Sequence, residues 1–380
     1  MKKLKKLTAL LAALALVFAL GSCANGSNSN DNPSKSKPAP TESSLGALTS
    51  LKAVEGVDYV YTVEYDGDYL LDDVIESNLK TSDELIAYLT ENVPSWKLAK
   101  ESGTPLTINV TGAGCCSIAA SNAGAAGGKI FGRNFDYPNG SAMIIHTMPY
   151  KGYESVSTSY PCFVTDQLWW EPTNNIMKDA VSLGLIYAPL DGLNEKGLYI
   201  SVLQLDDEET NQTDEGKNDV QTTVAIRYIL DKAASVAEAL EILDGFNMHN
   251  VFNTAYHYAI ADNTGKSVVV EYINNEMKVT DVKVVTNHYL TDNIAKPLPD
   301  ETSNSIKRFN AAYNAGEAVN WNMTPEQVRD ALSAASASQH HKDNPYSTLV
   351  SIWSAVFEPS SRKVTYYFRE DYTKGFEVTF

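Results

Sequence analysis

Hydrophobic and polar positions alternate along two stretches of this chain, 106–111 and 129–135, and each alternation predicts a β-strand with one buried face. The stretches 197–205 and 267–273 are predicted as strands because they are rich in β-branched residues. The stretch 279–286 fits one strand or a pair of strands. The predicted strands cover 106–111, 129–135, 197–205, 267–273, 279–286, 348–357 and 363–368.

Helical spacing of apolar residues appears between these strands. It predicts helices over 85–89, 224–234 and 236–243, and the first and third follow capping-box patterns. Pro325, directly after Thr324, is placed as the first residue of a further helix. Because blocks of strands are separated by a helical block, the chain is predicted to be an α+β protein with stacked layers.

The first fifty residues follow a different pattern. Lysines cluster within 2–6, an apolar run covers 7–20, and small residues lead to Cys23. This is the organisation of an export signal, and the run is too short to span a bilayer unaided. From 24 to 50 the chain is mostly small and polar, so we expect a disordered tether.

The predicted division of the chain has four parts. They are a signal peptide at 1–22, a tether at 23–50, a small N-terminal region at 51–114 and a large domain at 115–380. The four residues ending at Cys23, Leu-Gly-Ser-Cys, resemble the lipobox of bacterial lipoproteins. That resemblance implies a lipid on Cys23 and an exported protein anchored on the outer face of the bacterial cell membrane.

The charge balance argues against one class of partner. The chain has 30 Lys and Arg against 47 Asp and Glu, for a formal net charge of −17, so nucleic acid is not an expected ligand. No HExxH, CxxC or phosphate-binding loop occurs, and neither a metal nor a cofactor is predicted. The doublet at 340–341, His-His, is more typical of a solvated pair than of ligands.

Four cysteines remain to be explained. Cys23 is assigned to the anchor, Cys115 and Cys116 are adjacent, and Cys162 is isolated, so no disulfide framework follows. An exported protein that keeps a thiol needs a reason for it. Catalysis is one such reason.

One cluster of residue types suggests chemistry. Cys115 starts a strand, and Arg133 and Asp136 lie on the next, so an antiparallel hairpin would bring them together. Arg133 would favour a thiolate, and Asp136 could hold a protonated amine. In the plainer alternative the cysteines are small core residues and Arg133 pairs with Asp136 on the surface. Spacing alone favours that alternative.

Longer segments carry a resemblance to a known family. The segments 114–120 and 130–137 resemble the opening of the choloylglycine hydrolase, penicillin V acylase and N-acylethanolamine acid amidase superfamily of N-terminal nucleophile (Ntn) hydrolases. Further similar blocks follow in the same order at 191–198, 262–271 with 285–287, and 348–349 with 367–369. The resemblance implies a four-layered αββα fold, with two mainly antiparallel sheets between helix layers.

The same resemblance implies roles for single residues. Cys115 would be the nucleophile, with its own α-amine as the base once the preceding bond is cut, because an α-amine has a pKa of about 8. The apolar positions that follow favour Cys115 and leave Cys116 open. Asn287 matches the family's oxyanion-hole asparagine, and Arg308 its later arginine. Gln204 falls where relatives often have Asn or Tyr, which leaves its backbone amide as the oxyanion candidate.

The resulting hypothesis is an enzyme that hydrolyses a linear amide C–N bond of a small N-acylated molecule through a thioester. An acyltransferase on the same fold and a non-catalytic, ligand-binding lipoprotein are the alternatives. The acidic loop at 206–220 is expected near the pocket and suits an anionic bile salt poorly. The aromatic segments 160–163 and 168–170 could line the pocket or fill the core. Whether 51–114 is discarded or retained, and the oligomeric state, stay open.

Overall fold

The computed structural model describes residues 40–101, 103, 114–250, 254–291, 302–340 and 348–380, which all belong to one compact body, Lys37–Phe380. The predicted signal peptide, Cys23, most of the predicted tether and the strand predicted at 106–111 lie outside the described residues. Among the described residues, no helix has the length and apolar character needed to cross a membrane.

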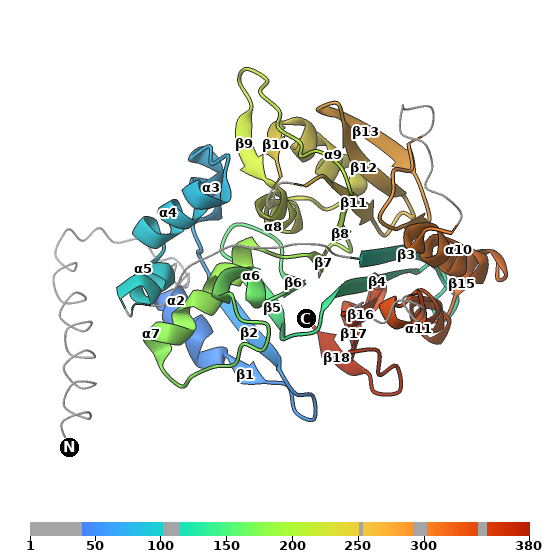
Figure 1. Ribbon diagram of the computed structural model, residues 1–380, viewed down its shortest axis with the longest axis horizontal. Coiled ribbons are helices and arrows are strands. Elements are labelled where there is room, and N and C mark those ends of the chain that lie inside the picture. Colours follow the sequence, from blue (N-terminus) through green and yellow to red (C-terminus); the bar gives the residue numbers. More distant parts are fainter. Residues whose placement is uncertain (1–39, 102, 104–113, 251–253, 292–301, 341–347) are drawn as a thin grey trace, which may run out of the picture. The chain divides into compact units, whose positions relative to one another are not determined.

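Two large sheets form the centre of this body (Figure 1). The nine-stranded sheet has the order β1-β2-β5-β6-β7-β8-β11-β12-β13, and its neighbours are antiparallel except for β2 with β5. Its strands are β1 Lys52–Ala53, β2 Val60–Gly67, β5 Ala142–Pro149, β6 Ser155–Ser159, β7 Asp191–Asn194, β8 Tyr199–Gln204, β11 Tyr256–Ala261, β12 Ser267–Ile273 and β13 Glu276–Asp281.

The seven-stranded sheet has the order β14-β3-β4-β16-β17-β18, with β15 paired in parallel to β3. A small parallel pair, β9 Asn218–Gln221 and β10 Phe246–His249, stands apart from both. The strands of the seven-stranded sheet are β3 Gly114–Asn122, β4 Lys129–Pro138, β14 Val284–Val285, β15 Asn322–Met323, β16 Leu349–Glu358, β17 Lys363–Phe368 and β18 Phe376–Thr379.

Helices occupy the outer faces and the N-terminal part. The α-helices are α2 Pro40–Ser50, α3 Leu71–Glu76, α4 Ser82–Asn92, α5 Pro94–Glu101, α6 Cys162–Thr165, α7 Ile176–Asp179, α8 Thr222–Lys232, α9 Val236–Asp244, α10 Asn304–Glu317, α11 Pro325–Ala334 and α12 Ala337–His340. Two 3-10 helices, η1 Ala180–Tyr187 and η2 Pro359–Ser361, complete the described elements.

The alternation of side chains along β3 explains the layers. Cys115 and Ala119 belong to the core between the sheets, where Phe131 of β4 stacks on Tyr199 of β8 with ring centroids 5.2 Å apart. Ile118 and its even-numbered neighbours on β3 join a second core with α10 and α11. Beyond the nine-stranded sheet, α8 packs on β7 and β8. This order of helices, sheet, sheet and helices confirms the predicted α+β sandwich.

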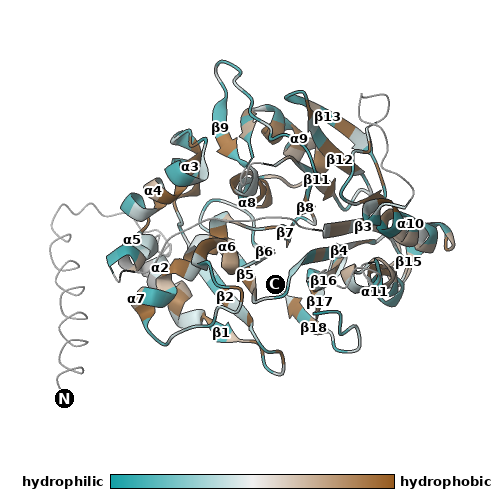
Figure 2. Ribbon diagram, viewed as in Figure 1, coloured by the Kyte–Doolittle hydropathy of each residue, from teal (hydrophilic) through white to brown (hydrophobic). Residues whose placement is uncertain are grey.

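Hydrophobic residues follow the strands of these layers. Figure 2 shows hydrophobic colours along β12 and hydrophilic colours in the loop that leads into β9. On β12 the residues from Val268 to Ile273 are all buried, as is typical of a strand covered on both faces. At β12 the nine-stranded sheet is therefore covered on both sides.

Most of the predicted elements are confirmed. The capping box at Thr81 starts α4, a side-chain cap at Ser235 starts α9, and Pro325 is the first residue of α11. The stretch 279–286 is a pair of strands, β13 and β14. The helix α10 was not predicted.

The prediction of a disordered tether is wrong for its last eleven residues. Pro40–Ser50 form the helix α2, in which Ala47 and Leu48 are buried. The hydroxyl groups of Ser44 and Tyr65 hydrogen-bond at 2.8 Å, which fixes α2 against β2. Composition alone misses such a helix, because its order comes from tertiary contacts rather than from its own propensity.

Candidate active site

The hairpin β3–β4 brings the first three predicted residues together. Gly114 lies opposite Asp136, Cys115 opposite Phe135, and Ser117 opposite Arg133. Neighbouring residues on a strand point to opposite faces, so Cys115 and Arg133 share the face between the sheets, while Asp136 lies on the helix side. The predicted antiparallel hairpin is confirmed.

Arg133 supplies a buried positive charge beside the thiol. Its Nη2 donates to the carbonyl of Val202 at 2.7 Å, and its Nε lies 3.5 Å from Oδ2 of Asp191. Burial raises the pKa of the Cys115 thiol, and the guanidinium of Arg133 opposes this rise. The plainer alternative is right that both cysteines are buried. Its surface pair of Arg133 and Asp136 is wrong, because both side chains are buried and Arg133 pairs with Asp191.

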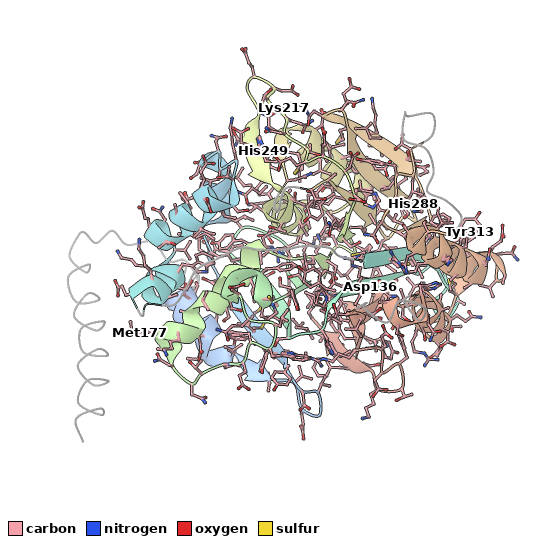
Figure 3. The ribbon with its side chains drawn as sticks, viewed as in Figure 1. Asp136, Met177, Lys217, His249, His288 and Tyr313 are labelled. Atoms are coloured by element: carbon pink, nitrogen blue, oxygen red, sulfur yellow. The ribbon has the colours of Figure 1, made fainter. Side chains whose placement is uncertain are left out.

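Asp136 presents a buried acceptor to the peptide bond that precedes Cys115. Its Oδ1 accepts from Ser351 Oγ at 2.6 Å, whereas its Oδ2 has no hydrogen-bond partner and lies 3.7 Å from Arg308 Nη1. A Cβ on Gly114 would stand 3.0 Å from that Oδ2. Burial raises the pKa of Asp136, and Arg308 opposes this rise. In Figure 3 Asp136 lies in the interior, near β4.

Asn287 follows β14, and its orientation is fixed. Its Oδ1 accepts from the backbone N–H of Cys115 at 2.7 Å and from Arg308 Nη2 at 2.8 Å. Its Nδ2 donates to the backbone carbonyl of Gln204 at 2.7 Å. A guanidinium can only donate, so the amide cannot be reversed without losing this contact. One N–H of Asn287 is thereby held on Gln204.

Arg308 connects the parts of the site. It lies on α10 with only 3% of its surface exposed, although charge rules alone would place it at the surface. Its Nε donates to Asn304 Oδ1 at 2.6 Å, and its Nη1 donates to the carbonyl of Cys115. With Asn287, it therefore holds both backbone polar groups of Cys115.

The two adjacent cysteines have different surroundings. Cys116 lies opposite Asn134 and packs into the core with α10 and α11, so it faces away from Arg133. Burial raises the pKa of Cys116 to about 12. Cys115 is 1% exposed in the uncut chain. The structure thus brings the following predicted residues to one place: Cys115, Arg133, Asp136, Gln204, Asn287 and Arg308.

Sequence reasoning missed the residues that support these groups. Asp191 pairs with Arg133 and also accepts from Trp353 Nε1 at 2.8 Å, while Ser351 and Asn304 hold Asp136 and Arg308. Asp191 begins one of the blocks that carry the family resemblance, so that block could have drawn attention to it. The other three stand out only through their contacts.

The remaining predictions have mixed outcomes. Of the aromatic segments, Tyr160, Phe163 and Trp170 are buried in the core, whereas Trp169 is 44% exposed. The acidic loop begins near Asn287, because the hydroxyl of Tyr289 donates to Asp207 Oδ2 at 2.9 Å. Among the described residues, no cluster of three or more His, Cys, Asp or Glu side chains could hold a metal ion.

Residues 183–372 match the family described as acyl-coenzyme A:6-aminopenicillanic acid acyl-transferase. The bile salt hydrolase/transferase of Clostridium perfringens (strain 13 / Type A) is 32% identical over 114 residues, which cover 26% of this chain and 32% of that protein. The matched part thus spans about a third of the length of that relative.

Solved structures resemble the fold. A mutant of conjugated bile acid hydrolase from Clostridium perfringens has a TM-score of 0.51 at 16% identity, over 70% of this chain and 92% of that chain. A second variant of the same hydrolase has a TM-score of 0.50, and penicillin V acylase from Agrobacterium tumefaciens has one of 0.45 at 18% identity, over 67% of this chain and 83% of its own. At 16% identity, the first likeness shows a shared fold.

Proposed function

The chain belongs to the acyl-coenzyme A:6-aminopenicillanic acid acyl-transferase family, within the choloylglycine hydrolase superfamily of Ntn hydrolases, and from this membership we propose that it is a cysteine amidohydrolase. Its substrate is a small N-acylated molecule with a linear amide bond. The reaction passes through a thioester on Cys115. Cleavage of the bond between Gly114 and Cys115 activates it.

The activating step follows from the position of Cys115. Its thiol adds to the carbonyl carbon of Gly114, the C–N bond breaks, and the thiol proton passes to the freed nitrogen. Water then hydrolyses the resulting thioester, which leaves a carboxylate on Gly114 and a free α-amine on Cys115. The unpartnered Oδ2 of Asp136 beside Gly114 supports this step, because it can accept a hydrogen bond from the new amine.

The same groups then act on a substrate amide. The α-amine takes the thiol proton, the sulfur attacks the carbonyl, and the negative oxygen of the intermediate binds the second hydrogen of Asn287 Nδ2. Collapse of the intermediate breaks the C–N bond, and the amine proton goes to the leaving nitrogen. Water hydrolyses the thioester. Arg133 stabilises the negative sulfur both when it attacks the amide and when hydrolysis of the thioester releases it.

A single observation carries this proposal. Of the two adjacent cysteines, Cys115 has its backbone N–H bound by Asn287 and its carbonyl bound by Arg308, and Arg308 also binds Asn287. These three residues come from β3, from the segment after β14 and from α10. A structural cysteine needs no such convergence of separate elements.

The test compares Cys115→Ala with Cys116→Ala in the full chain. We expect Cys115→Ala to stay uncut and to lose at least about 10⁴-fold in amidase activity, since it lacks the nucleophile. Cys116→Ala should still be cut and active, because its side chain faces the helices. Intact-mass analysis and release of p-nitroaniline from acetyl, octanoyl and phenylacetyl p-nitroanilides are the two readouts. Activity of uncut wild type, or of Cys115→Ala, would contradict the proposal.

The family description favours one second candidate, acyl transfer. On the same fold, an amine would attack the thioester in place of water. Adding small amines to the reaction and weighing the products separates the two activities. The acidic residues that start beside Tyr289 favour substrates without a bulky negative charge at that rim.

The N-terminal predictions remain part of the proposal. We propose export and lipid attachment at Cys23, which would anchor the enzyme on the outer face of the cell membrane. The support is the lysine-rich start, the apolar run and the lipobox-like residues before Cys23. Metabolic labelling with a fatty acid, lost in Cys23→Ala, tests it.

A further inference from the structure

A buried pair of titratable side chains that the mechanism does not use lies beside the Asn287 segment. His257 on β11 and Glu271 on β12 are both fully buried, and their strands are antiparallel neighbours. His257 Nδ1 lies 3.1 Å from Glu271 Oε1. Burying two charged side chains is costly unless each is fully hydrogen-bonded, so their other contacts show what the pair holds.

The second ring nitrogen of His257, Nε2, contacts the backbone carbonyl of Thr286 at 2.7 Å, and a carbonyl can only accept. Nε2 therefore carries a proton. The other nitrogen faces a carboxylate that accepts further hydrogen bonds from the backbone of Leu290 at 2.8 Å and of Thr291 at 2.9 Å. Burial would raise the pKa of Glu271, but the bonds from His257 and Thr291 bring it below its ordinary value. Both ring nitrogens thus lie against oxygen atoms of neighbouring elements.

These hydrogen bonds hold the segment 286–291 at both ends. His257 holds its first carbonyl, and Glu271 holds the N–H groups at 290 and 291 together with the hydroxyl of Thr291. Asn287 lies between these two sets of hydrogen bonds, one residue after Thr286. Its amide must point at once to Cys115, Arg308 and Gln204, so a small rotation of this segment would break contacts on both sides.

We propose that His257 and Glu271 are positioning residues that fix the 286–291 segment and thereby aim the Asn287 amide at the reacting carbonyl oxygen. This inference rests on the proposed amidase function, in which Asn287 binds the oxyanion. It adds two residues that touch neither the substrate nor Cys115. Their effect reaches the reaction only through Asn287.

The test uses His257→Gln and Glu271→Gln in the full chain, alone and combined with Asn287→Ala. With the best p-nitroanilide, each single variant should lose about 10-fold to 100-fold in kcat with little change in KM, because the oxyanion contact matters in the transition state. In the Asn287→Ala background, neither variant should reduce kcat further. Alkylation of Cys115 by iodoacetamide, which forms no oxyanion, should keep its wild-type rate.

The matched control is His249→Gln. His249 is also buried and paired with a carboxylate, Asp219, at 2.7 Å, but it lies on β10, apart from His288 and the Asn287 segment (Figure 3). It should keep the wild-type kcat. If His257→Gln does not fold, Glu271→Gln carries the test, because its remaining side-chain oxygen still accepts from Thr291.

Two results would overturn the inference. The first is a kcat within about twofold of wild type in the folded single variants. The second is a loss of kcat that is as large in the Asn287→Ala background as in the wild-type background, because that result indicates a general structural role. A failure of the proposed function looks different. In that case wild-type protein is itself uncut and inactive, whatever residue occupies 257.

Discussion

His288, next to Asn287, shows how burial sets the charge of a single residue. Its Nδ1 lies 2.8 Å from Ser305 Oγ and 3.1 Å from Thr286 Oγ1, so two neutral hydroxyl groups surround it. Burial lowers the pKa of His288 to about 4, and the neighbouring His257 adds to this effect. His288 is therefore neutral in the folded protein at physiological pH.

The lowered pKa of His288 in the folded protein predicts that stability depends on pH. Above the unfolded pKa of about 6.5, His288 is neutral in both the folded and the unfolded state, so it does not change the free energy of unfolding. As the pH falls from there towards about 4, only the unfolded chain gains the proton, so the free energy of unfolding drops by up to about 1.4 kcal/mol per pH unit. His288→Asn should flatten this part of the curve, measured by urea unfolding at several pH values. Parallel curves for both proteins would contradict the prediction.

At the scale of elements, the contact between β4 and α11 leaves no room for a side chain. A Cβ on Gly132 would lie 2.7 Å from Val328 Cγ1 and 3.3 Å from Leu332 Cδ1. This close approach seats the helix layer on the strand that carries Arg133 and Asp136. The strand itself was predictable from its alternation. The need for glycine at 132 was not, because it arises from the contact with α11.

Gly132→Ala should therefore destabilise the protein by about 1 to 3 kcal/mol, because overpacking forces β4 and α11 apart. Gly46→Ala is the matched control. A Cβ on Gly46 meets nothing within 4 Å, and alanine favours the helix α2. Thermal unfolding of both variants is the measurement. Equal midpoints would show that the layers adapt without cost.

At the scale of the whole molecule, the residues upstream of Cys115 are part of the same core. β2 pairs with β5 inside the nine-stranded sheet, and fully buried Trp96 of α5 packs against Gly184 of η1. The hydroxyl of Tyr69 donates to Asp231 on α8. Cutting one peptide bond would leave these contacts in place.

We accordingly predict that the upstream fragment stays bound after cleavage. Two chains should co-elute in gel filtration and separate only in denaturant. Gly184→Ala should weaken this association, because a methyl group at 184 would overlap the Trp96 indole. Gly245→Ala, whose added Cβ makes contacts of 3.4 Å and 3.5 Å, should not. A wild-type fragment lost during native purification would show that it is discarded.

The sequence alone determined the local elements and the candidate residues of this protein. Period-two alternation predicted β4, and a run of β-branched residues predicted β12, since both patterns depend on near neighbours. Four blocks in order pointed to Cys115 and Asn287. Cys115 and Asn287 are 172 positions apart in the chain, and their contact was implied by the family resemblance and not by any local pattern.

Only the tertiary structure decided which groups are buried and paired. It ordered α2, turned Arg308 inward and joined His257 to Glu271. Each of these depends on surfaces contributed by distant segments. The physical reason is that burial removes water from a charged group, and only the neighbours brought by folding determine whether a partner replaces it.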